Sequence, residues 1–78
     1  MKKQISDSEL MNLPLGSIIE VEWKPNNIAD TEKYRGVIFS NQIGYEDGKI
    51  DYVRTIAEST YLCLCAVYLE VNRNDQEV

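Results

Sequence analysis

The chain has 78 residues, of which 44% are hydrophobic and 27% are charged. This length and composition predict one globular domain over residues 1–78 with a small core, and they exclude a low-complexity or disordered chain. Only the two polar ends, about residues 1–4 and 72–78, are expected to fray.

Thirteen acidic and eight basic residues give a net charge of −5. Nucleic acids and anionic membranes are bound by clustered Lys and Arg, whereas only Lys2 and Lys3 are adjacent here. Direct binding to nucleic acid is therefore disfavoured. The start lacks the apolar segment of a signal peptide, and no apolar run reaches the ~20 residues of a membrane helix. We expect a cytoplasmic protein.

A short helix is predicted near the start of the chain. Ser6 precedes Glu9 by three residues, which is the spacing of a capping box, and Ile5 and Leu10 occupy the positions of a hydrophobic staple. The helix should run from about Asp7 to Asn12.

Alternating residues predict a half-buried strand over 17–24. Its inward side chains would be Ile19, Val21 and Trp23, and its outward ones Glu20, Glu22 and Lys24. A loop over 24–33 with Pro and Asn residues follows, and then a second strand over 34–40, which is rich in aromatic and β-branched residues.

The dipeptide Asp47-Gly48 suits a two-residue hairpin turn. Such a turn would place Glu46 opposite Lys49, Tyr45 opposite Ile50 and Ile43 opposite Tyr52. The last four side chains would then share one face, and Glu46, Lys49 and Asp51 would share the other.

The stretch "TYLCLCAVYLEV", residues 60–71, would be apolar on both faces of a regular element. Tyr, Cys and Val favour a strand, Leu and Ala suit a helix, and both interpretations remain open. The preceding "TIAEST" is expected to be a polar connection. As a strand, 60–71 would leave Leu62, Leu64 and Tyr68 incompletely covered, which predicts self-association of the chain, most simply as a homodimer.

These elements predict a mainly β fold, with α+β also possible: a small antiparallel sheet or an SH3-like partly open barrel with a short N-terminal helix. The segment "LGSIIEVEW" resembles the first strand of many SH3-like barrels, and the resemblance extends in strand order over about residues 15–71. Because the aromatic ligand-binding motif of signalling SH3 domains is absent, binding of proline-rich peptides is not implied.

Catalysis is not expected. The chain has no His, and neither Cys63 nor Cys65 has a basic neighbour that would lower its pKa. Two cysteines on one strand face, about 6.6 Å apart, would be reduced core thiols. They supply only two of the four ligands of a zinc site, so neither a metal nor a cofactor is expected.

A protein partner is the favoured hypothesis for function. Five acidic side chains are expected to point outward; they are Glu20, Glu22, Glu46, Asp47 and Asp51. Two interpretations of these acids remain open: they bind a partner, for example one with a basic nucleic-acid-binding groove, or they form a solvated face that keeps the protein soluble. The leading hypothesis is a non-enzymatic inhibitor or adaptor that uses an acidic or apolar surface. Small acidic chains of this kind resemble the accessory inhibitors that phages carry against host defence systems, including the anti-CRISPR type. For a phage-encoded chain, the expected cytoplasm is that of the host cell. The alternatives are a self-assembling structural subunit and, against the charge, a single-strand nucleic-acid binder.

Overall fold

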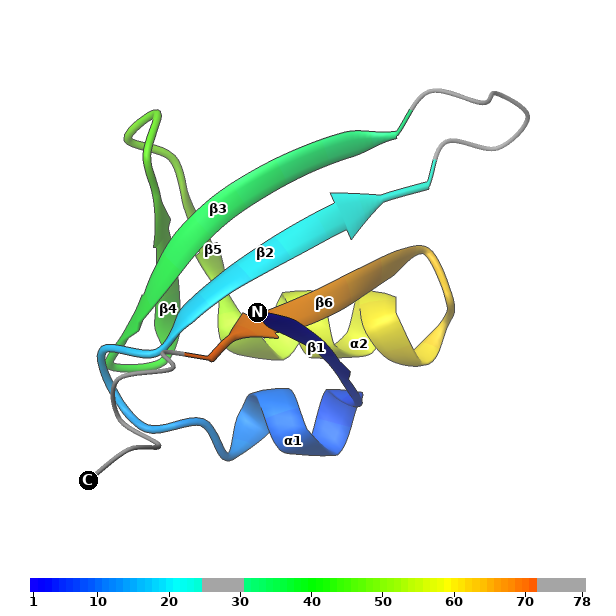
Figure 1. Ribbon diagram of the computed structural model, residues 1–78, viewed down its shortest axis with the longest axis horizontal. Helices are drawn as coiled ribbons and strands as arrows, with labels where there is room; N and C mark the ends of the chain where they lie inside the picture. Colours follow the sequence, from blue (N-terminus) through cyan, green and yellow to red (C-terminus); the bar gives the residue numbers. More distant parts are fainter. Residues whose placement is uncertain (25–30, 72–78) are drawn as a thin grey trace.

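A computed structural model describes residues 1–24 and 31–71 (Figure 1). Six strands form one antiparallel sheet in the order β1-β6-β2-β3-β4-β5. The strands are β1 (Lys2–Ile5), β2 (Ile18–Trp23), β3 (Glu32–Phe39), β4 (Gln42–Tyr45), β5 (Ile50–Tyr52) and β6 (Cys65–Glu70), and the helices are α1 (Asp7–Met11) and α2 (Val53–Tyr61). Both helices pack on one face, here called the inner face, and the opposite one is the outer face (Figure 1).

The expected mainly β fold, a small antiparallel sheet with a short N-terminal helix, is confirmed. Among the described residues, β1 and β5 each pair with a single neighbouring strand, so the sheet is open and does not close into a barrel. Strands β4 and β5 turn away from the direction of β2 and β3 (Figure 1), which curves the sheet around one end of the inner face.

Helix α1 forms where the capping signal predicts it. The Ser6 hydroxyl accepts a hydrogen bond from the Glu9 backbone N–H at 3.2 Å, and the Glu9 carboxylate accepts one from the Ser6 N–H at 3.1 Å. Ile5 and Leu10 are both buried in the core, as the staple requires. The helix ends at Met11, and Asn12 is its C-cap.

Strands β2 and β3 form where the sequence predicts them. Ile19 and Val21 are fully buried, whereas Trp23 at the end of β2 is only partly buried. Strand β3 begins at Glu32, two residues earlier than predicted. Most of the expected loop over 24–33 lies outside the described residues.

Residues 2–5 do not fray as expected. They form β1, which pairs with β6 from Lys2 opposite Glu70 to Ile5 opposite Val67. The strand is difficult to predict from the sequence because only Ile5 is buried, and the other three side chains of this edge strand are polar and exposed. The other predicted frayed end, 72–78, lies outside the described residues.

The β4–β5 hairpin lies where it was predicted, but its register is shifted by one residue. Gly44 pairs with Ile50 and Ile43 with Asp51, and the Tyr45 N–H donates to the Lys49 carbonyl at 2.9 Å. The turn therefore has three residues, 46–48, and ends in Gly48 with a φ of +90°, which is a known alternative to the two-residue turn. The shift moves Ile50 and Tyr52 to the outer face and Asp51 to the inner face, so the predicted separation of the two faces was wrong.

The stretch 60–71 is neither one strand nor one helix. Helix α2 includes the supposed connection "TIAEST" and ends at Tyr61, a turn with a positive φ of 63° at Cys63 follows, and β6 begins at Cys65. Val53, Ile56 and Ala57 are the buried side chains of α2. They are spaced three and four residues apart, as on one face of a helix. Because the residues between them are mostly polar, the sequence was interpreted as a connection.

Candidate functional site

Two of the five acids expected to bind a partner are neutralised on the outer face. The Glu20 carboxylate lies 2.8 Å from the Lys2 ammonium, and the Glu22 carboxylate lies 3.7 Å from that of Lys33. The Glu20 and Glu22 side chains are only 17% and 18% exposed. The Glu22 pair joins the adjacent strands β2 and β3, whereas the Glu20 pair reaches from β2 across β6 to β1. Both carboxylates therefore offer little charge to a partner.

A third ion pair completes the charge balance of the outer face. The Arg35 guanidinium donates two hydrogen bonds to the two carboxylate oxygens of Glu70, each at 2.9 Å. These bonds lower the pKa of Glu70 and raise that of Arg35. Three bases on this face thus meet three acids.

The other three predicted acids lie together at the β4–β5 hairpin. Glu46 and Asp47 are exposed in the turn, and Asp51 is partly buried on the inner face. The Asp47 carboxylate accepts a hydrogen bond from the Lys49 backbone N–H at 3.0 Å, and this bond fixes the turn. Lys49 is the only basic residue within the hairpin. We call residues 45–51 the hairpin end.

The hairpin end closes one side of a cavity of about 280 Å³ on the inner face. We call this cavity the hairpin pocket; it is lined by Trp23, Tyr34, Tyr45, Asp47, Lys49, Ile50 and Asp51. Ile50 belongs to the outer face by its register, and it also lines the pocket because β5 is the edge strand of the sheet. Three strands supply its aromatic rings, because β2 ends at Trp23 while Tyr34 and Tyr45 extend from β3 and β4. The two tyrosine rings meet edge to face, with centroids 5.9 Å apart and planes at 63°. Edge-to-face packing is one of the arrangements that aromatic pairs prefer.

The hydroxyl of Tyr45 is the least satisfied polar group of the pocket. It is buried and has no hydrogen-bond partner in the described part of the chain. Its burial, followed by the nearby negative charge of Asp51, raises the pKa of Tyr45, so the hydroxyl stays protonated at neutral pH. The Tyr34 hydroxyl, by contrast, donates to the Glu32 carboxylate at the rim.

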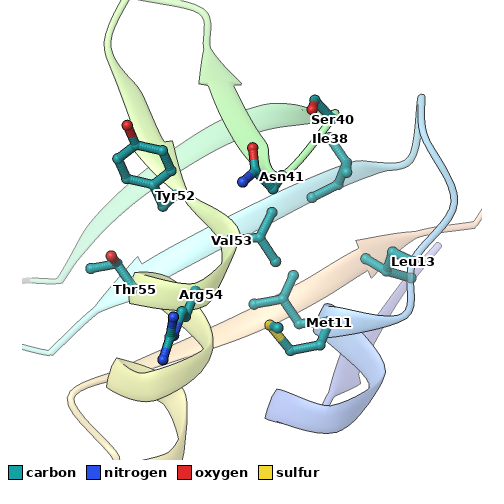
Figure 2. Close-up of a pocket in the computed structure, with 10 residues that line it drawn as sticks. Met11, Leu13, Ile38, Ser40, Asn41, Tyr52, Val53, Arg54 and Thr55 are labelled. Carbon is teal, nitrogen blue, oxygen red and sulfur yellow. The ribbon is translucent and has the colours of Figure 1, made fainter.

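A larger cavity of about 480 Å³ lies between α1 and the start of α2 (Figure 2). Met11, Leu13 and Val53 surround it, and Arg54 and Thr55 lie on the first turn of α2 (Figure 2). Its lining within the described residues contains no carboxylate, thiol or imidazole, so it offers no pair of groups for acid–base catalysis.

The residues expected to drive self-association do not lie together. Leu62 and Leu64 are 57% and 47% exposed in the turn between α2 and β6, whereas Tyr68 lies within β6 opposite Gln4 and Glu20. A different apolar surface appears on the outer face, which we call the outer patch: Ile18, Val37, Phe39, Ile50 and Tyr52. The sequence did not reveal this patch because the expected hairpin register turned Ile50 and Tyr52 inward.

The two thiols are free and differ in environment. Cys65 is buried next to Thr60, and burial raises the pKa of its thiol, so Cys65 has little thiolate character. Cys63 is exposed in the turn before β6, so the two do not share a strand face as expected. The described residues contain no group of three or more His, Cys, Asp or Glu side chains that could hold a metal ion. Neither helix in the described ranges has the length and apolar character needed to cross a membrane.

Comparison with known proteins gives no relative: no family model, no curated protein and no solved structure matches this chain.

Proposed function

We propose that this protein is a non-enzymatic protein-binding module, a small acidic inhibitor or adaptor whose hairpin end docks on a basic surface of a partner protein. The observation that carries the proposal is the gathering of Glu46, Asp47 and Asp51 beside the aromatic rings of the hairpin pocket. A basic nucleic-acid-binding groove is the kind of surface that would meet this end. A more specific form of the proposal is that a phage encodes this chain and that the chain inhibits a defence protein of the host.

Electrostatics support the hairpin end over the outer face as the docking site. The six charges of the outer face are engaged with one another, whereas the hairpin end has three carboxylates and one ammonium group. An excess of negative charge on a protruding element accelerates encounters with a basic partner and helps to orient it. The same excess opposes direct binding to nucleic acid.

The test uses a fluorescent peptide of alternating lysine and glycine as the probe and measures anisotropy at about 20 mM and about 300 mM salt. The hairpin variant is Glu46→Gln/Asp47→Asn/Asp51→Asn, in which the amide oxygen introduced at position 47 can still accept the turn hydrogen bond. The matched control is Asp7→Asn/Glu9→Gln/Glu58→Gln, which removes three charges from the two helices. We expect the hairpin variant to bind the peptide about tenfold more weakly at low salt. Each of the three carboxylates that it lacks contributes about 0.5 kcal/mol to the free energy of binding.

The control variant should keep most of the wild-type affinity. An equal loss in both variants would mean that only the net charge matters, and docking through the hairpin end would be refuted. Binding that does not weaken at high salt would refute it as well, because exposed charges are screened.

The outer patch favours a second candidate function, self-assembly into a homodimer. Phe39 is 42% exposed and Tyr52 56% exposed, and neither helix covers this side of the sheet. A second copy is the favoured occupant because each chain has a net charge of −5, while the charges of the outer face are engaged in ion pairs. Two copies therefore repel each other least when their outer faces meet.

A further inference from the structure

The hairpin pocket combines two kinds of group, aromatic rings and carboxylates. Trp23, Tyr34 and Tyr45 form aromatic walls that are only partly buried, and Asp47 and Asp51 add two carboxylates. Aromatic faces and carboxylates both attract cations, the first through the ring quadrupole and the second through charge. The ligand that this combination fits is a cation with a flat or apolar surface.

We propose that the hairpin pocket binds a guanidinium group, that of an arginine side chain. The presentation of this arginine by a partner protein rests on the proposed function, whereas the affinity of the pocket for guanidinium does not. The pocket would then be the central anchor of the interface, since buried arginine and aromatic residues dominate binding energy at interfaces.

The hydrogen-bonding groups of the pocket favour guanidinium over other cations. The Asp47 oxygen that does not bind the Lys49 N–H and the Asp51 carboxylate can accept hydrogen bonds from a ligand in the pocket. A guanidinium has five N–H donors in one plane, stacks on aromatic rings and is weakly hydrated. A quaternary ammonium has no N–H to donate, and a primary ammonium is more strongly hydrated and cannot stack.

Lys49 modulates the pocket from within. Its side chain lines the cavity, and among the described residues it makes no ion pair within 4 Å. Its positive charge weakens the attraction of the pocket for a second cation. We therefore expect Lys49→Gln to strengthen the binding of guanidinium by about threefold.

The test is an NMR titration that follows the indole N–H of Trp23, which is the single tryptophan of the chain. The probes are the N-acetyl amides of arginine, lysine and citrulline, together with tetramethylammonium chloride, each added up to about 50 mM, because one side chain alone binds in the millimolar range. We expect a saturable shift with the arginine amide, binding at least about fivefold weaker with the lysine amide, and none with the neutral citrulline amide.

Variants assign the binding to the pocket. Asp51→Asn should weaken binding of the arginine amide about tenfold and Tyr34→Leu about fivefold, because the first removes a charged acceptor and the second an aromatic wall. Tyr61→Leu and Asp7→Asn, which change an aromatic and an acidic residue outside the pocket, should leave the affinity unchanged. Thermal melts of each variant show that it is folded.

Three results would overturn the proposal: no saturable shift with the arginine amide, an equal response to citrulline amide or tetramethylammonium, or unchanged binding in both pocket variants. The outcome is separable from that of the docking test. If the lysine and glycine peptide binds while the arginine amide does not, only the proposal of a guanidinium pocket is refuted. If the arginine amide binds while the peptide does not, only docking through the hairpin end is refuted.

Discussion

Replacing Gly36 with alanine tests the packing of the inner face where it supports the hairpin pocket. Gly36 is buried in β3 opposite Tyr45. A Cβ atom added there would lie 2.6 Å from a methyl carbon of Ile43, 3.0 Å from the Tyr45 ring and 3.1 Å from the Gly44 carbonyl oxygen. Because Ile43 is fully buried and Gly44 contributes backbone, these neighbours cannot yield without a shift of β4.

The size of the effect follows from this overpacking. One extra methyl group in a filled core costs about 1–3 kcal/mol, and the three close contacts place Gly36→Ala near the middle of that range, at about 2 kcal/mol. A domain of this size has a free energy of unfolding on the order of 5 kcal/mol, so the loss is a large fraction of it. The melting temperature should fall by about 10 °C.

Urea denaturation measures the loss, provided that the slope of free energy against urea stays the same as in the wild type. Gly44→Ala is the matched control, since a Cβ there lies 2.8 Å from the ring edge of Phe39, a partly exposed side chain that can rotate away. We expect Gly44→Ala to cost about 1 kcal/mol or less. If Gly36→Ala were as stable as the wild type, or less damaging than Gly44→Ala, the packing of β3 against β4 described above would be wrong.

Three further predictions concern the turn, the tyrosine hydroxyl and the outer patch. Gly48→Val should lower the free energy of unfolding by about 1 kcal/mol or more, because a β-branched residue cannot adopt a φ of +90° without strain, and an unchanged urea midpoint would contradict the three-residue turn. The raised pKa of Tyr45 favours the protonated hydroxyl in the folded state, so stability is retained below pH 10 and falls as pH rises beyond it; Tyr45→Phe should reduce this alkaline loss in urea midpoints measured from pH 8 to 11. In analytical ultracentrifugation the wild type should sediment above its 9.0 kDa monomer mass. Phe39→Glu should shift it to monomer while Leu64→Glu does not, and a monomeric wild type at high concentration would exclude self-assembly.

The sequence predicts an element correctly where contacts between residues close together in the chain determine that element. The contacts between Ser6 and Glu9 lie within one helical turn, so the spacing alone predicts α1. The alternation over β2 likewise reflects one covered sheet face, and it identifies Ile19 and Val21 as core residues.

The candidate site depends on a detail that the sequence does not determine. Asp47-Gly48 is compatible with turns of two or of three residues, and the choice decides which face receives Asp51, Ile50 and Tyr52. A difference of one residue in the length of the turn thus places Asp51 in the hairpin pocket, and it places Ile50 and Tyr52 in the outer patch. Helix α2 was missed for a related reason, since only three of its nine residues are buried and the rest have the composition of a loop.

The place of β6 in the sheet imposes an order on folding. This strand lies between β1 and β2, so that Val67 is opposite Ile5 on one side and Val21 on the other. The first strand of the chain therefore has no partner until residues 65–70 have been synthesised and inserted. The strands β2 to β5 follow one another along the chain and can pair earlier, whereas the insertion of β6 closes a long chain segment between β1 and itself. Until that insertion, the edge of β2 carries unpaired backbone groups and is open to pairing with another nascent chain.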